Sequence, residues 1–319
     1  MHVAVTGAAG MIGRKLVDRL VADGRLGDAE LDRLTLVDVV APDPPAVDTE
    51  AFAGDLADPT AAQRLVDGRP DVIVHLAAVV SGEAEADFAK GYRVNLDGTR
   101  TLLEAIRGSD GYRPRLVFAS SIAVFGAPLP DPIPEDFAAL PLTSYGTQKA
   151  IDELLLADYT RRGFVDGVGI RLPTICIRPG APNKAASGFF SSILREPLVG
   201  REAVLPVPET VRHWHASPRS AVEFCLRAAT IDTEQIGPRR TLSMPGLSAT
   251  VGEQIEALRR VGGEAAVRLI RHEPDPDIMR MIGGWAAALD ASRAERLGFV
   301  AEKSFDEIIR VHLEDELHR

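Results

Sequence analysis

Cysteine is scarce in this sequence. The 319 residues include two cysteines, Cys176 and Cys225. They form neither a CxxC pair nor a cysteine–histidine cluster, so neither a disulfide framework nor a zinc site is indicated. A reducing compartment fits this composition, and we expect a cytoplasmic protein.

The sequence also lacks the features of secreted, membrane-spanning and nucleic-acid-binding proteins. No apolar run reaches the roughly 18 residues of a membrane-spanning helix, and the start, Met-His-Val-Ala-Val-Thr-Gly, has no basic signal region. We therefore expect neither secretion nor membrane insertion. Lysine and arginine number 36 against 46 aspartates and glutamates, and the net charge of −10 would repel a phosphate backbone. A nucleic-acid partner is not expected.

The composition, 45% hydrophobic and 26% charged, is that of a folded globular protein. A chain of 319 residues exceeds the roughly 250 to 300 residues at which a single core stops growing. A proline- and glycine-rich stretch over 173–208 interrupts the pattern of the first half. We therefore predict a main domain over residues 1–172, to which later segments return, and a smaller α/β lobe made mainly of residues 173–319.

Short apolar runs alternate with amphipathic stretches in the first half. The runs are Val3–Val5, Leu34–Val37, Val72–Leu76 and Leu116–Ala119. Strands without polar alternation are buried on both faces, which predicts a doubly wound parallel α/β sheet covered by helices. Helical periodicity is clear over about residues 83–106 and 144–159. Both helices are long enough to pair with a second copy, so we expect a homodimer with a four-helix interface.

A glycine-rich turn connects the first strand to the first helix. It reads Thr-Gly-Ala-Ala-Gly-Met-Ile-Gly over residues 6–13. Gly7 allows a tight turn, Gly10 allows close approach of a pyrophosphate, and Gly13 lets the helix pack against the strand. Met11 and Ile12 begin the helix whose N–H groups would face the pyrophosphate. The alternative is a turn required by sterics alone, without a ligand.

Asp38 ends the second strand, where a carboxylate accepts hydrogen bonds from the ribose hydroxyls of a bound dinucleotide. No arginine or lysine follows within Val39–Pro42 to neutralise a 2′-phosphate, so Asp38 predicts NAD and not NADP. A solvated carboxylate at the strand end is the alternative. Small or short side chains after the third and fourth strands leave room for adenine and ribose. The alternative is that these residues form ordinary loops at the strand ends, without a ligand. These residues are Asp55, Leu56, Leu76, Ala77 and Ala78.

Tyr145 and Lys149 lie four residues apart, on one face of a predicted helix. A tyrosine with the ordinary pKa of about 10 is a poor base at neutral pH, but a nearby ammonium favours the phenolate. Ser120 and Ser121 end the fifth strand, where a hydroxyl can hold a substrate oxygen beside that phenolate. A solvated helix face is the alternative for the tyrosine–lysine pair.

Five motifs in this order resemble the extended short-chain dehydrogenase/reductase superfamily. They are TGAAGMIG at 6–13, HLAA at 75–78, YRVNLDGT around Asn95, SSIAVFG at 120–126 and YGTQK at 145–149. The match covers about the first 180 residues. The resemblance implies a seven-stranded Rossmann sheet, bound NAD and a serine–tyrosine–lysine active site.

The resemblance also gives roles to individual residues. It implies that Tyr145 is the catalytic acid/base, and that Lys149 lowers the pKa of this tyrosine and binds the nicotinamide ribose. Ser121 would orient the reacting oxygen and contact the substrate, and Ser120 would lie near the nicotinamide. Asn95 matches the helix asparagine of the family. We place it at the cofactor site, with a largely structural role as a buried group that bonds to backbone.

The second half departs from the members of this superfamily that act on nucleotide sugars. It lacks their Asn-x-Tyr-Gly-Pro stretch, and residues 171–190 contain no obvious aromatic platform for a nucleotide base. A smaller substrate is therefore expected. This segment and Arg212–Arg219 are similar to the D-erythronate dehydrogenase subgroup, in which a small sugar acid is oxidised at its 2-hydroxyl with NAD. The resemblance implies that Pro173 and Thr174 border the nicotinamide.

Two arginines are candidates for binding a substrate. Arg178 follows the sixth strand, and Arg212 lies where superfamily members place an arginine against a diphosphate. A bidentate pair from Arg212 would hold a carboxylate, and a surface arginine is its alternative. His213 and His215 alternate as in a strand, but no third ligand is apparent, so we predict no metal site.

Three functions remain open. The favoured one is oxidation of the 2-hydroxyl of a small sugar acid such as D-erythronate, with accumulation of NADH. A nucleotide-sugar 4-epimerase or dehydratase would instead reduce and reoxidise a tightly bound NAD within one cycle. A regulatory protein that senses NAD commonly loses the tyrosine–lysine pair, which this sequence keeps.

Overall fold

The computed structural model describes residues 1–180 and 187–318. Residues 181–186, which belong to the segment expected to bind substrate, and residue 319 lie outside the described residues. The chain forms two compact units. The first comprises residues 1–124, 143–171 and 222–242, and the second comprises residues 125–142, 172–221 and those from Ser243 onward. The boundary that we predicted near residue 172 lies at one of the points where the chain passes between the units.

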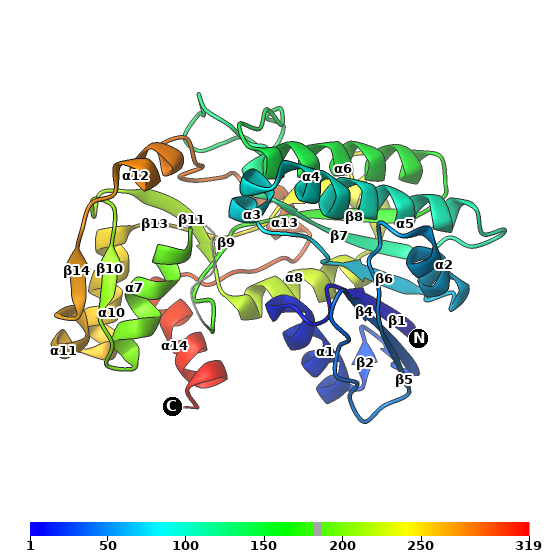
Figure 1. Ribbon diagram of the computed structural model, residues 1–319, viewed down its shortest axis with the longest axis horizontal. Helices are drawn as coiled ribbons and strands as arrows, with labels where there is room; N and C mark the ends of the chain where they lie inside the picture. The colour runs from blue at the N-terminus through cyan, green and yellow to red at the C-terminus, as the bar shows by residue number, and fades with distance from the viewer. Residues whose placement is uncertain (181–186, 319) are drawn as a thin grey trace. The chain divides into compact units, whose positions relative to one another are not determined.

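The first unit is built on a seven-stranded sheet (Figure 1). In spatial order the strands are β5 (Thr49–Ala53), β4 (Arg33–Asp38), β1 (His2–Thr6), β6 (Val72–His75), β7 (Arg115–Ser121), β8 (Asp166–Leu172) and β12 (Thr241–Ser243). The five strands from β5 to β7 run parallel. Because β4 and β6 flank β1 on opposite sides, the strand order reverses at β1, which creates a topological switch point. The prediction of a doubly wound Rossmann-type sheet is confirmed.

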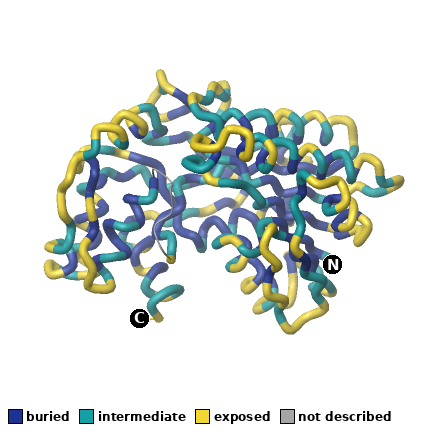
Figure 2. Tube along the Cα trace, in the orientation of Figure 1, coloured by how far each residue is buried: buried dark blue, intermediate teal, exposed yellow. Residues whose placement is uncertain are grey.

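Helices cover both faces of this sheet, as Figure 1 shows. On one face, α2 (Pro59–Asp67), α5 (Gly98–Arg107) and α6 (Ser144–Arg161) pack side by side. On the other face lie α1 (Met11–Asp23) and α8 (Pro218–Thr230), which the ion pair between Arg19 and Glu223 connects. The central strands are therefore buried, dark blue in Figure 2, which explains their lack of polar alternation.

The helix predicted over residues 83–106 is present, but it is broken at one residue and contains a π-helical segment. The structure has α3 (Ser81–Ala86), α4 (Phe88–Gly91), the π-helical η1 (Tyr92–Asp97) and α5. The break falls at Asp87, whose backbone leaves the helical region at φ −128° and ψ 87°. Its carboxylate accepts a hydrogen bond of 3.0 Å from the Lys90 N–H and so caps α4. Aspartate favours such a cap over a helix interior, and apolar periodicity alone does not detect it.

The remaining short elements of the first unit connect its strands and helices. They are β2 (Arg25–Leu26), β3 (Ala29–Glu30), the 3₁₀ turn η2 (Ile122–Val124) and α9 (Thr233–Ile236). The helix predicted over residues 144–159 corresponds to α6, which continues two residues further. Thr143 caps this helix, because its hydroxyl accepts a hydrogen bond of 3.0 Å from the Gly146 N–H.

The second unit has two small sheets and its own core. One sheet has the order β13 (Leu247–Thr250), β11 (Arg212–Ala216), β9 (Thr174–Ile175), and the other pairs β10 (Ala203–Leu205) with β14 (Ile270–His272). Its helices are α7 (Gly188–Leu198), α10 (Val251–Gly262), α11 (Glu264–Val267), α12 (Pro276–Ile282), α13 (Ser292–Arg296) and α14 (Phe305–Glu316). Phe190, Leu258 and Ile309 belong to the buried core that joins α7, α10 and α14.

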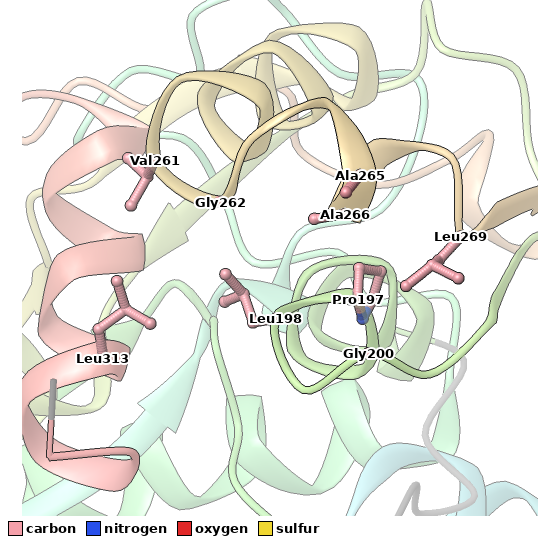
Figure 3. A pocket seen from close by; sticks show the side chains of 9 residues that line it. All are labelled: Pro197, Leu198, Gly200, Val261, Gly262, Ala265, Ala266, Leu269 and Leu313. Atoms are coloured by element: carbon pink, nitrogen blue, oxygen red, sulfur yellow. The ribbon is translucent and has the colours of Figure 1, made fainter.

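An apolar pocket lies among helices of the second unit (Figure 3). Its lining residues are Pro197, Leu198, Gly200, Val261, Gly262, Ala265, Ala266, Leu269 and Leu313. None of these side chains can orient a ligand by a hydrogen bond, so the pocket has none of the chemistry predicted for the active site. Within residues 1–180 and 187–318, no helix combines the length and apolar character that crossing a membrane requires.

Candidate active site

The glycine turn packs tightly against its surroundings. Gly7 has φ +71°, a left-handed conformation that favours glycine, and its N–H donates to the Val37 carbonyl at 2.8 Å. A Cβ atom on Gly7 would lie 2.7 Å from the Ala77 nitrogen. A Cβ atom on Gly13 would lie 2.2 Å from the Gly7 carbonyl oxygen. Both positions therefore require glycine, and the turn brings helix α1 close to the ends of β1 and β6.

The N-terminus of α1 is suited to an anion. Gly10 is the N-cap, and no side chain caps the first turn, which also contains no acidic residue. The first N–H groups of a helix have no partner within the helix and carry partial positive charge. The backbone of Met11, Ile12 and Gly13 can therefore bind the diphosphate of a dinucleotide.

Asp38 lies directly beside this turn. One carboxylate oxygen accepts a hydrogen bond of 2.9 Å from the Ala9 N–H, and the other accepts one of 2.7 Å from the Val39 N–H. A carboxylate has about four acceptor positions, so two remain for a pair of ribose hydroxyls. The Arg14 Nε donates to the Ala9 carbonyl at 2.6 Å and so supports the turn. These residues fit the adenosine end of NAD.

The residues after β5 and β6 form the neighbouring loops. The Asp55 carboxylate accepts from the Ala57 N–H at 2.9 Å and pairs with Arg93 at 2.7 Å. Leu56 is buried beside it, whereas the three residues after His75 are partly buried. These three are Leu76, Ala77 and Ala78.

Lys149 is almost completely buried, with 2% of its surface exposed. Its ammonium donates to the Ala119 carbonyl at 2.9 Å and lies 5.8 Å from the centre of the Tyr145 ring. A solvated helix face, the alternative for this pair, is therefore wrong for Lys149. Burial lowers the pKa of Lys149 below that of a free lysine, and the nearby carboxylates of Asp152 and Glu153 oppose this effect.

The ends of β7 and α6 bring the predicted catalytic residues into one region of the first unit. Ala119, which binds Lys149, is two residues before Ser121. The Ser121 hydroxyl oxygen accepts a hydrogen bond of 3.1 Å from the Ala123 N–H, at the start of η2. The structure thus joins the strand end that carries Ser121 to the helix that carries Tyr145 and Lys149.

Charged residues that the sequence analysis missed lie behind this group. The Ser120 hydroxyl donates to Glu153 at 2.5 Å, so Ser120 faces helix α6. Arg171 forms a bidentate ion pair with the same carboxylate, at 2.9 Å from Nε and 2.7 Å from Nη2. Both Ser120 and Glu153 are buried. The YGTQK motif ends at Lys149 and does not include Glu153. The one sequence signal for Glu153 is its spacing of four residues from Lys149, which places both side chains on the same face of the helix.

A second buried network reaches the same helix. The Thr99 hydroxyl lies 3.4 Å from the Asp152 carboxylate and 3.0 Å from His75 Nε2. His75 Nδ1 lies 2.7 Å from the Thr6 hydroxyl. Burial, with the nearby charge of Lys149 as a smaller cause, lowers the pKa of His75 to about 3, so this ring is neutral. Burial also raises the pKa of Asp152.

Asn95 connects a loop to α6. Its side-chain oxygen accepts from the Val79 N–H at 2.8 Å, and its amide nitrogen donates to Gln148 Oε1 at 2.7 Å. Asn95 is buried. These contacts agree with our interpretation of Asn95 as a buried group that satisfies backbone.

In the second unit, Thr174 bonds to a histidine. Its hydroxyl lies 2.7 Å from His213 Nε2, and His213 Nδ1 donates to the Ala286 carbonyl at 2.8 Å. Burial lowers the pKa of His213 to about 4. His215 is buried and bonds to Gln254 at 3.0 Å. Pro173, which directly precedes β9, is buried too. Among the residues that the structure describes, no group of three or more histidine, cysteine, aspartate or glutamate side chains could hold a metal ion.

The two candidate arginines differ in their surroundings. Arg178 is partly buried, and its guanidinium donates to the Ile175 carbonyl at 3.0 Å and to the Ser187 hydroxyl at 2.8 Å. Arg212 lies at the exposed start of β11, with an ion pair of 3.3 Å to Glu253. The Arg212 guanidinium also donates to the Ser248 carbonyl at 3.2 Å. Both arginines therefore have protein acceptors, and Arg178 is the more buried of the two.

Comparison with known proteins places this geometry in a family. The sequence pattern of the NAD dependent epimerase/dehydratase family matches residues 3–230, more than half of the chain. The chain belongs to the NAD-dependent epimerase/dehydratase family. The resemblance to the extended short-chain dehydrogenase/reductases is therefore confirmed. The chain is an NAD-dependent oxidoreductase of that type, and the prediction of NAD as its cofactor is confirmed.

Members of this family resemble the chain over nearly its full length. A D-erythronate dehydrogenase of Cupriavidus necator is 47% identical over 99% of this chain and 98% of its own. A D-erythronate dehydrogenase of Haemophilus influenzae is 41% identical over 99% of this chain and 100% of its own. A crystal structure described as a nucleoside-diphosphate-sugar epimerase from Agrobacterium tumefaciens is 68% identical, with a TM-score of 0.97, over 100% of this chain and 95% of its own.

Proposed function

We propose that this protein oxidises the 2-hydroxyl of a small sugar acid, such as D-erythronate, to the 2-oxo acid and reduces NAD⁺ to NADH. The observation that carries the proposal is the buried Lys149 beside Tyr145 at the end of β7. The full-length similarity to two D-erythronate dehydrogenases supports the choice of substrate.

In this mechanism Tyr145 is the general base. Its phenolate oxygen accepts the proton of the substrate 2-hydroxyl, while the hydrogen on carbon 2 leaves as a hydride. NAD⁺, when bound, supplies the hydride acceptor. The Lys149 ammonium stabilises the phenolate, and its bond to the Ala119 carbonyl keeps it in place. The Ser121 hydroxyl donates to the substrate oxygen and orients it.

The cofactor residues divide between the two ends of NAD. We assign the diphosphate to the backbone of the glycine turn and α1, and the adenosine ribose to Asp38. The residues that would border adenine and its ribose are Asp55, Leu56, Leu76, Ala77 and Ala78. Lys149 would bind the nicotinamide ribose, and Pro173 and Thr174 would border the nicotinamide. Asn95 and Ser120 would support the site from behind, because both bond to other protein groups.

For the substrate carboxylate, we favour Arg178 over Arg212. Both guanidinium groups have two protein acceptors, but those of Arg178 are an uncharged carbonyl and a hydroxyl, and its partial burial strengthens a bond to a carboxylate. To bind a carboxylate, Arg212 would have to break its ion pair with Glu253 and lose the water that hydrates it at the surface.

The test is a screen of four- to six-carbon aldonic acids and of UDP-, GDP- and dTDP-sugars, with NADH formation and sugar interconversion as readouts. We expect NADH to accumulate with a small aldonic acid. In Tyr145→Phe, turnover should fall roughly 100- to 10,000-fold while NAD binding persists, because only the ionisable oxygen is lost. Interconversion of a nucleotide sugar without net NADH would favour the epimerase alternative, which the description of the Agrobacterium structure keeps open.

We also propose a homodimer through the outer faces of α5 and α6. Helix α6 directs Lys149 and Glu153 inward, whereas Leu154 on its outer side is 72% exposed. Leu154 therefore lies on the face that a second copy would cover. Analytical ultracentrifugation of the wild type and Leu154→Glu tests this, and a wild-type monomer would refute it.

A further inference from the structure

The inner face of α6 is unusually polar for a buried helix. Its buried residues are Gly146, Gln148, Lys149, Asp152, Glu153, Leu156 and Thr160. Leu156 is the one large apolar side chain among them. A helix normally docks through an apolar stripe, whose packing tolerates small shifts. Directional hydrogen bonds and ion pairs must therefore contribute much of the position of α6 against β7.

Two such contacts involve consecutive residues of β7. The Ala119 carbonyl accepts from Lys149 at 2.9 Å, and the Ser120 hydroxyl donates to Glu153 at 2.5 Å. Lys149 and Glu153 are four residues apart, so they lie on one face of α6 with a rise of about 6 Å between them. These two contacts hold the part of α6 that carries Lys149 against the carboxyl end of β7.

Arg171 completes the second contact. Its guanidinium binds Glu153 through Nε at 2.9 Å and 3.2 Å, and through Nη2 at 2.7 Å. One Glu153 oxygen also accepts from Ser120, so both oxygens have partners. Because Arg171 belongs to β8, the carboxylate ties α6 to two adjacent strands at their carboxyl ends.

We propose that Ser120, Glu153 and Arg171 are positioning residues for the active site, and that their network fixes α6 so that Tyr145 and Lys149 remain beside Ser121. This inference rests on the proposed function for the roles of those three catalytic residues. Without the network, the Lys149–Ala119 bond is the remaining side-chain contact between α6 and the carboxyl end of β7 described above. A displacement of roughly 1 Å at Tyr145 can reduce turnover about 100-fold.

The same strands provide a matched control. At their amino ends, Asp166 of β8 accepts from Arg115 of β7 at 2.8 Å and from the Thr233 hydroxyl at 2.9 Å. This network likewise combines a carboxylate with an arginine and a hydroxyl, with a second arginine, Arg240, at 3.3 Å, and its ion pair with Arg115 is also largely buried. Arg115 and Ser121 are the two ends of β7, roughly 20 Å apart for a strand of this length.

The experiment compares Ser120→Ala and Glu153→Gln with Thr233→Ala and Asp166→Asn in the full-length protein. We expect roughly a 10- to 100-fold loss of kcat in the first pair, with the KM for the acid and the Kd for NADH little changed. The second pair should lower Tm comparably and leave kcat near the wild-type value. Equal losses of kcat in both pairs, or no loss in the first, would overturn the proposal. If Glu153→Gln does not fold, the uncharged Ser120→Ala variant decides.

A second readout does not depend on turnover. The absorbance of tyrosinate, corrected with Tyr145→Phe, follows the ionisation of Tyr145. Ser120→Ala removes no charge from Lys149, which lies near this phenol, or from Asp152 and Glu153, whose carboxylates act on Lys149. We therefore expect Tyr145 to ionise at higher pH in Ser120→Ala, because a shift of α6 along β7 weakens the bond to the Ala119 carbonyl that holds the Lys149 ammonium in place, and at the wild-type pH in Thr233→Ala. This shift would occur even if no aldonic acid were a substrate, so the positioning proposal can be tested independently of the proposed function. An unchanged titration of Tyr145 in Ser120→Ala would refute the positioning role.

Discussion

Replacing Lys149 by methionine tests the central electrostatic claim. Methionine has nearly the same length and is apolar, so it can occupy the buried position while the ammonium is removed. The proposed role of Lys149 is to stabilise the negative charge that Tyr145 carries as a base. The variant should therefore reduce the fraction of Tyr145 present as phenolate and lower kcat.

The structure allows the size of this effect to be calculated. The ammonium lies 5.8 Å from the centre of the Tyr145 ring. At this separation, two unit charges in an effective dielectric constant of about 20 interact by about 3 kcal/mol. Because about 1.4 kcal/mol corresponds to a factor of ten, kcat near neutral pH should fall about 100-fold. The lost hydrogen bond to Ala119 adds a cost in stability, of about 1 to 3 kcal/mol for a buried carbonyl left unpaired.

The assay is NADH formation from the best aldonic acid, measured across a series of pH values. The deficit of Lys149→Met should shrink as pH rises, because the phenol then ionises without help. It should shrink further because burial lowers the pKa of Lys149, so the wild type loses its ammonium at a lower pH than a free lysine would. A deficit that is the same at every pH would show that Lys149 acts by binding and not by charge, and wild-type turnover would refute any role.

Three further predictions concern the cofactor, the substrate and stability. Asp38→Ala should lower the ratio of kcat/KM for NAD over NADP, and an unchanged ratio would exclude Asp38 as the ribose ligand. Arg178→Ala should reduce kcat/KM for the acid roughly 10- to 150-fold but scarcely affect a neutral polyol of the same length, whereas Arg212→Ala should affect neither; the reverse result would restore Arg212 as the carboxylate ligand. Burial lowers the pKa of His75 to about 3 and of His213 to about 4, so both rings take up protons mainly on unfolding. The free energy of unfolding should therefore fall as pH drops below about 6.5, by up to about 1.4 kcal/mol per pH unit for each histidine, and urea midpoints that do not fall would contradict this.

The fold was predictable because its signals are local. Apolar runs such as Val72–His75 indicated buried parallel strands, and the turn at Gly7 marked the connection to α1. The break in the predicted helix over 83–106 was missed because one cap at Asp87, and not the apolar pattern, determines where α4 begins. The π-helical segment around Asn95 has no sequence signal of its own.

The residues of the candidate site were predictable only where they belong to a recognisable sequence motif. The spacing of Tyr145 and Lys149 identified that pair, and the order of residues along β4 identified Asp38. Arg171 lies 18 positions after Glu153, and no local pattern indicates that these two residues would form an ion pair. The sequence suggested Arg212 as a carboxylate ligand. In the structure Arg212 pairs with Glu253, a residue of the capping box of α10, and the sequence does not show that these two residues come together.

The same reasoning explains why α6 has so little amphipathic character although one of its faces is buried against the sheet. Its inner face carries Lys149 and Glu153 because the proposed chemistry needs an ammonium held away from water, and a buried charge is tolerated only with compensating partners. Those partners, the Ala119 carbonyl, Ser120 and Arg171, come from β7 and β8. A helix buried through charges loses the apolar stripe by which sequence analysis recognises a buried face. The weakest hydrophobic signal in the first unit therefore coincides with the helix on which the proposed catalysis depends.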